Sequence, residues 1–181
     1  MTFPTDLFAV SALIITDSSG TRLTSKYFNS PFKTLIAQQS FEKSLFDKSK
    51  RGANDVILLD SQIIVFKTCV DVIVYIVGSM AENELILSSI LSTFIEALNI
   101  VLKTPVEKRA LLDNLDLLFL TIDETISEGI LLESEPSLIA SRVTRPLQDG
   151  DARIGGIPLN EQSFSQAIQA ARDQLAKSLL K

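Results

Sequence analysis

The residue types that most often perform chemistry in proteins are scarce in this chain of 181 residues, which has no histidine and a single cysteine, Cys69. Histidine is the only side chain that normally titrates near neutral pH and is the commonest metal ligand, so its absence removes both roles. One cysteine excludes an internal disulfide framework and a thiolate metal cluster, and it fits a reducing compartment. Cys69 is expected in a tight turn between two apolar strands, where a small filler is a better interpretation than a reactive thiol.

The remaining polar groups do not converge on a catalytic or metal site. Two carboxylate pairs fall between residues 113 and 124, within an amphipathic segment where charges normally form the solvated face. Residues 149–151, Asp-Gly-Asp, lack the alternating ligands and closing glutamate of a calcium loop. The glycine pair at 155–156 is not followed by the lysine and serine or threonine of a phosphate-binding loop. The sequence therefore predicts no enzyme, no cofactor and no metal ion.

Charge and hydropathy point away from nucleic acid and towards apolar contacts. The 17 basic and 22 acidic residues give a net charge of −5, which is unsuited to binding a phosphate backbone. Lys48, Lys50 and Arg51 form a small basic cluster that could touch acidic lipid or protein, although a solvated loop is favoured. The mean hydropathy of +0.27 is high for a chain with 22% charged residues. Residues 85–102 are interrupted by serines and by Glu96, so we expect a buried helix rather than a transmembrane segment.

The first half of the chain has the pattern of a five-stranded antiparallel sheet with one helix inserted after the second strand. A helix is expected from a Ser30 cap and Pro31 to about Phe46. Small polar residues at 16–20 indicate a hairpin between the first two strands, and short connections indicate a meander of the last three. The expected strands are residues 7–15, 21–28, 56–59, 62–67 and 71–77.

The second half is predicted to be helical, with clear signals for the beginning and end of its helices. Ser79 to Glu82 and Thr104 to Glu107 each fit a capping box, which starts one helix that runs to about Lys103 and a second helix that Gly129 ends. A short helix follows over 134–142. The order is therefore ββαβββ followed by helices, an α+β fold.

Composition divides the chain into a folded domain, residues 1–144, a flexible linker, 145–159, and a C-terminal helical tail, 160–181. Glycine, proline and aspartate concentrate in the linker. The tail repeats apolar residues at spacings of three and four, but its stripe is only one residue wide. Such a helix is expected to dock along a groove of its own domain or of a partner. We expect truncation before Asn160 to leave the domain folded.

The helices over 82–103 and 107–129 carry more apolar residues than one buried face requires. Because a domain of this size has little room for two central helices, the economical explanation is an obligate partner that buries the excess. The candidate partner-interface residues are Leu87, Leu91, Leu98, Leu117, Leu118, Phe119 and Leu120. Aspartate at Leu118 or Phe119 is expected to abolish partner binding or solubility.

Several segments resemble the zeta subunits of the coatomer vesicle coat, within the longin-like family of clathrin-adaptor small subunits. The likeness covers roughly residues 7–143 and 158–181, whereas 146–157 match no segment of that family. The segments that carry it are YIVGS (75–79), MAENELIL (80–87), VEKRALLDN (106–114), FLTIDE (119–124), AQQSFEK (37–43) and SQA (165–167).

The resemblance implies a longin-like fold and a non-enzymatic role. It implies that the chain packs into the trunk of the coatomer gamma subunit, and through it joins the rest of coatomer. It also implies recruitment of that complex by an Arf-family GTPase, with no nucleic acid and no transmembrane segment. The expected location is the cytoplasm, peripheral on the Golgi membrane and coated vesicles, in Golgi-to-ER retrograde and intra-Golgi transport.

Two other functions stay open at this point. A clathrin-adaptor small (sigma) subunit that binds acidic dileucine cargo signals shares the Glu-Asn-Glu-Leu segment. A small-molecule-binding or enzymatic domain on a similar sheet would need convergent polar residues at strand ends, which the sequence does not offer. Which surface meets the partner, whether the tail docks in cis or in trans, and whether cargo is bound are left open.

Overall fold

The computed structural model describes residues 10–28, 31–50, 55–144, 153–154 and 157–158. Contacts divide the chain into two compact units, Met1–Thr144 and Arg145–Lys181. In the first unit the elements are β1 (Ala12–Asp17), β2 (Arg22–Tyr27), α1 (Leu35–Ser49), β3 (Val56–Leu59), β4 (Gln62–Cys69), β5 (Val72–Ser79), α2 (Glu84–Leu102), α3 (Lys108–Asp113), α4 (Leu115–Thr125), β6 (Ile126–Ser127), β7 (Ile130–Leu131) and α5 (Pro136–Val143).

The first five strands form one antiparallel sheet in the order β2-β1-β5-β4-β3, which confirms the predicted hairpin and meander. The turn between β3 and β4 is two residues long, and Asp60 and Ser61 both have positive φ, 49° and 60°. Two successive positive φ angles match the right-handed twist of the flanking strands. The strands β1, β4 and β5 are rich in β-branched residues, which pack well on both faces of a central sheet.

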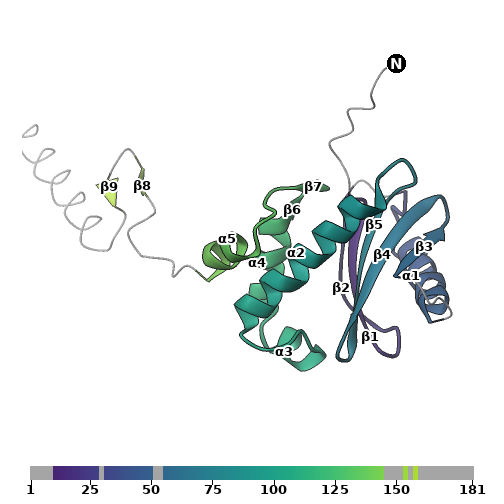
Figure 1. Ribbon diagram of the computed structural model, residues 1–181, viewed down its shortest axis with the longest axis horizontal. Helices are drawn as coiled ribbons and strands as arrows, with labels where there is room; N and C mark the ends of the chain where they lie inside the picture. Colours follow the sequence, from purple (N-terminus) through teal and green to yellow (C-terminus); the bar gives the residue numbers. More distant parts are fainter. Residues whose placement is uncertain (1–9, 29–30, 51–54, 145–152, 155–156, 159–181) are drawn as a thin grey trace, which may run out of the picture. The chain divides into compact units, whose positions relative to one another are not determined.

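Each face of the sheet is covered by a different helix layer (Figure 1). Alternate residues of the strands pack with Phe41 and Leu45 of α1 on one face. The other alternate residues pack with α2, α3 and α4 on the opposite face, where they form the larger core cluster. A third, smaller cluster joins α2 to α5 through Ala97, Val101 and Ile139. The α2 helix is therefore enclosed by the sheet on one side and by other helices on another.

Four predicted helix boundaries are wrong, and three of them fail because a different group supplies the cap. Ser30 lies outside the described residues, but α1 begins only at Leu35, because Thr34 Oγ1 accepts a hydrogen bond from Ala37 N at 3.3 Å. The α2 helix is capped by Asn83, whose Oδ1 accepts from Leu85 N at 2.8 Å, while Ser79 is the last residue of β5. The first turn of α3 uses the Asp71 carboxylate, which accepts from Lys108 N at 2.8 Å.

The predicted second helix is also divided and shorter than expected. Asn114 leaves helical geometry, with φ −135° and ψ 50°, and its side chain donates to Ala110 O at 2.9 Å. The chain therefore forms α3 and α4 in place of one helix. Gly129 does not cap a helix, because α4 ends at Thr125 and Gly129 takes φ +87° in the tight β6–β7 hairpin.

The second unit contains two short paired strands, β8 (Arg153–Ile154) and β9 (Ile157–Pro158). They lie within the segment predicted as a flexible linker, which thus contains local backbone pairing. The predicted tail helix, 160–181, lies outside the described residues.

Candidate partner interface

The structure divides the seven predicted interface residues into three groups. Leu87, Leu91, Leu98 and Leu118 are buried in the larger core cluster, between the sheet and the helices that cover it. Leu117 is partly buried against the cluster that joins α2 to α5. Phe119 and Leu120 are each 49% exposed.

Burial of the four leucines corrects the assumption that placed them on an exposed surface. More elements surround α2 than its apolar pattern predicted. The sheet covers one side of it, and α4 and α5 cover another, so the chain itself buries most of its apolar residues. A partner role for the remaining residues stays a prediction, and it now concerns Leu117, Phe119 and Leu120.

The α4 helix has distinct inner and outer faces. The inner face carries Leu118 and Ile122 together with Thr121 and Thr125. Both threonine hydroxyls are satisfied within the helix: they donate to Leu117 O and Thr121 O, each at 2.7 Å. Buried polar groups with such partners cost little. The register that buries these residues turns the intervening positions outward.

Five side chains on the outer face of α4 are exposed, and we call them the α4 outer face: Leu115, Asp116, Phe119, Leu120 and Asp123. Because residues four apart are neighbours on a helix, Leu115, Phe119 and Asp123 form one row, and Asp116 and Leu120 form a second. Each row therefore combines exposed apolar area with one carboxylate. Asp123 pairs with Lys26 of β2.

Other exposed apolar side chains lie elsewhere on the first unit. Leu35 and Ile36 of α1 were not among the predicted interface residues, and Ile36 is 81% exposed. Leu85, Ile86 and Ile100 of α2 are also exposed, on the part of that helix that neither the sheet nor α4 and α5 cover.

The α2 helix also satisfies the length and composition of a membrane-spanning helix, and among the described residues it is the one helix that does so. Half of its most apolar window is buried inside the fold. Its buried leucines contact the sheet and the neighbouring helices, as in the core helix predicted from the sequence.

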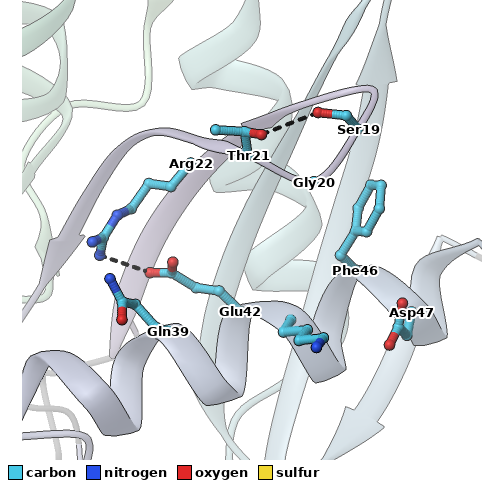
Figure 2. A pocket seen from close by; sticks show the side chains of 9 residues that line it. Ser19, Gly20, Thr21, Arg22, Gln39, Glu42, Phe46 and Asp47 are labelled. Atoms are coloured by element: carbon cyan, nitrogen blue, oxygen red, sulfur yellow. Dashed lines mark hydrogen bonds and ion pairs between the residues drawn. The ribbon is translucent and has the colours of Figure 1, made fainter.

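A polar pocket of about 550 Å³ lies between the β1–β2 turn and α1 (Figure 2). Arg22 from β2 and Glu42 from α1 point toward one another across it, with Nη1 and Oε1 3.1 Å apart. Glu42 is only 6% exposed, and it also accepts a hydrogen bond from the Tyr27 hydroxyl at 2.8 Å. Burial, followed by the hydrogen bond to Glu42, raises the pKa of Tyr27. The pocket's arginine is thus already paired within the chain.

A second polar network ties the β1–β2 turn to the start of α3. The Asp17 carboxylate accepts from Ser19 N and Thr21 N, both at 2.9 Å, and from Ser19 Oγ at 2.6 Å. Its other oxygen accepts from Lys108 Nζ at 2.9 Å. The Ser19 hydrogen bond and then Lys108 hold the pKa of Asp17 well below its ordinary value. The network links two segments that are distant in the sequence, so its role is structural.

The smaller candidates for chemistry are each held by local contacts. Burial raises the pKa of the half-buried Cys69 thiol, only partly opposed by Lys67, so it is protonated at neutral pH. Of the basic cluster, Lys48 Nζ donates to Leu58 O at 3.1 Å, and Lys50 Nζ lies 4.3 Å from the centre of the Phe46 ring. Arg51 lies outside the described residues. Within the described part of the chain, no group of three or more histidine, cysteine, aspartate or glutamate residues could hold a metal ion.

A family model described as "Clathrin adaptor complex small chain" matches residues 9–149, most of the chain. The chain belongs to the clathrin adaptor small chain family. The family match spans all the elements from β1 to α5, including the α4 outer face.

Among its relatives in this family are coatomer zeta subunits from animals and plants. The chain is 38% identical over 175 residues to coatomer subunit zeta-1 of Homo sapiens, and the alignment covers 97% of this chain and 95% of the relative. It is 41% identical over 175 residues to coatomer subunit zeta-2 of Arabidopsis thaliana, and this alignment covers 94% of this chain and 95% of the relative. These similarities confirm the resemblance drawn from the segments between residues 37 and 167.

The fold is shared with a chain of much lower sequence identity. A chain of a homology model of the full-length AP-3 complex, in a stretched open conformation, superimposes with a TM-score of 0.57 at 14% identity. The match covers 91% of this chain and 98% of the other. It confirms the predicted longin-like architecture, a five-stranded antiparallel sheet with flanking helices.

Proposed function

We propose that this chain is the zeta-type small subunit of a coatomer vesicle coat, bound to the trunk of the gamma-type large subunit. The observation that carries this proposal is identity of 38–41% to coatomer zeta subunits along nearly the whole length of both chains. Such matched length means that the relatives have no large extra domain in which a different activity could reside. The role is structural, and no catalytic step is assigned to the chain.

The clathrin-adaptor sigma alternative is less favoured. The adaptor-complex structure shares the fold at only 14% identity, far below the zeta subunits. The fold alone does not distinguish a coatomer subunit from a clathrin-adaptor subunit, because proteins with one fold can have many functions.

The rest of the proposal follows from membership of coatomer. We propose that the chain reaches membranes through the assembled coat, which an Arf-family GTPase recruits to the Golgi, and that it acts in retrograde and intra-Golgi transport. The chain is then cytoplasmic, and peripheral on Golgi membranes and coated vesicles.

Co-expression with two large chains tests the proposal. The full chain is expressed with the trunk of a coatomer gamma subunit, and separately with the trunk of a clathrin-adaptor large subunit, followed by size-exclusion chromatography. We expect a stable one-to-one complex with the gamma trunk only. Co-elution with the adaptor trunk, or a monodisperse chain that ignores both trunks, would refute the coatomer role.

A further inference from the structure

On the outer face of α4, carboxylates lie among exposed apolar side chains. Phe119 follows Leu115 by one turn, and Asp123 follows Phe119 by another, while Asp116 and Leu120 form the adjacent row. All five side chains are exposed in the first unit. An occupant of this surface must therefore cover apolar area and compensate carboxylates at the same time.

The charges of this face limit what can bind it. The segment 115–125 contains no lysine or arginine, so the corresponding helix of a second copy could not supply a cation to Asp116. An anionic lipid surface would be repelled by the same carboxylates. Within the described residues Asp123 already pairs with Lys26, whereas no ion pair is found for Asp116. The carboxylate of Asp116 is thus the group that a basic partner would meet.

We propose that the α4 outer face docks onto the large coat subunit, on a surface where lysine or arginine side chains flank an apolar ridge. This inference rests on the proposed function and adds to it the face used and the chemistry of the partner. Phe119 and Leu120 are the apolar anchors, and Asp116 sets the register by pairing with a cation. An aromatic anchor beside an aliphatic one, with a charged group at the rim, is typical of protein interfaces.

Matched surface variants of the full chain test the assignment by titration calorimetry against the purified gamma trunk. The double substitution Phe119→Ser with Leu120→Ser removes the anchors, and Leu35→Ser with Ile36→Ser removes the same number of exposed apolar side chains from α1. We expect at least tenfold weaker binding for the α4 variant and less than a twofold change for the α1 variant. Thermal melting of each isolated variant verifies that it is folded.

A charge variant keeps the test independent of the apolar substitutions. Asp116→Lys is expected to weaken binding at least tenfold, with a reduced effect at high salt, because it replaces an attraction by a repulsion. Asp47→Lys on α1 is the matched control and is expected to bind as the unmodified chain does.

Each outcome separates the two proposals. Failure of the unmodified chain to bind the trunk would refute the proposed function. Normal binding by both α4 variants would leave that function intact and overturn this inference. Two other occupants would overturn it as well: self-association of the isolated chain that the α4 double variant abolishes, or binding to phosphatidylserine vesicles that the same variant abolishes.

Discussion

The Asp17 carboxylate is held in its ionised form by contacts that join two distant segments of the first unit. It accepts hydrogen bonds from the β1–β2 turn and from Lys108 at the start of α3. Since these donors favour the ionised form, the folded pKa lies below the unfolded one. The carboxylate therefore adds stability above the unfolded pKa, about 3.9. That contribution decreases as the pH falls below this value and is lost when the pH passes the folded pKa.

The variant Asp17→Asn tests this contribution because asparagine retains an acceptor oxygen but not the charge. We expect it to lower the free energy of unfolding at pH 7 by about 1.5–3 kcal/mol. The difference from the unmodified chain should shrink by about 1 kcal/mol when the pH is lowered from 7 to 3. Urea denaturation at both pH values measures this. Asp60→Asn, in the exposed β3–β4 turn, is the control, and an equally large loss there would contradict the assignment.

Leu118 and Phe119 are adjacent in sequence but have opposite environments. Leu118 is fully buried in the core, whereas Phe119 is half exposed. We expect Leu118→Ala to lower the free energy of unfolding of the isolated chain by about 2–5 kcal/mol. Phe119→Ala should change it by less than about 0.5 kcal/mol. Chemical denaturation of both variants measures these effects, and similar values for the two would contradict the observed orientation of α4.

Among the elements, α2 is capped by Asn83, whereas the sequence pattern predicted a cap at Ser79. Asn83→Ala removes the acceptor of Leu85 N and is expected to destabilise the first unit by about 1 kcal/mol. Ser79→Ala removes only a 3.2 Å hydrogen bond from Ala81 N, within a turn before the helix, and should cost a few tenths of that. Thermal unfolding of the two variants measures the difference. Greater destabilisation by Ser79→Ala than by Asn83→Ala would contradict the Asn83 cap and favour the capping box predicted at Ser79.

Local sequence patterns were sufficient to predict which segments form helices and which form strands. They were not sufficient to predict the residues at which the helices begin and end. Strand periodicity and short connections were sufficient for the sheet, because neighbouring strands pair through turns of two residues such as Asp60-Ser61. Helix ends depended on competition between nearby polar groups, of which Asn83 and Thr34 supply the caps in the structure. The α3 cap could not be predicted locally, since its acceptor, Asp71, lies 37 residues away.

The candidate site was predicted only in part, because it too depends on tertiary contacts that the local sequence does not show. The apolar run 117–120 was correctly noticed, but which of its members point outward depends on where α5 and the sheet lie. Thr121 and Thr125 turn inward despite their hydroxyl groups, since each finds a backbone acceptor in its own helix. These two polar residues on the buried face made the inner side of α4 difficult to recognise.

At the scale of the molecule, the high mean hydropathy of +0.27 has two sources. Much of it is internal, in the clusters on the two sheet faces and between α2 and α5. Among the described residues, the remainder is exposed on separate helices, including α4, and also on β3 and in connecting segments. A chain with this division is expected to fold by itself and to retain apolar area for a partner.

The described core implies that the first unit does not require the rest of the chain for folding. All residues in the three core clusters lie between Val10 and Val143. The unit boundary falls directly after them, at Thr144. We therefore expect a chain truncated before Asn160 to melt within about 2 °C of the full chain, because no residue of these clusters is removed. A second truncation after Ile130 provides the contrast: it removes Ile139, Ala140 and Val143, exposes Ala97 and Val101, and should lower the melting temperature markedly. Calorimetry of the three chains measures this, and unfolding of the first truncation would mean that the C-terminal segment belongs to the core.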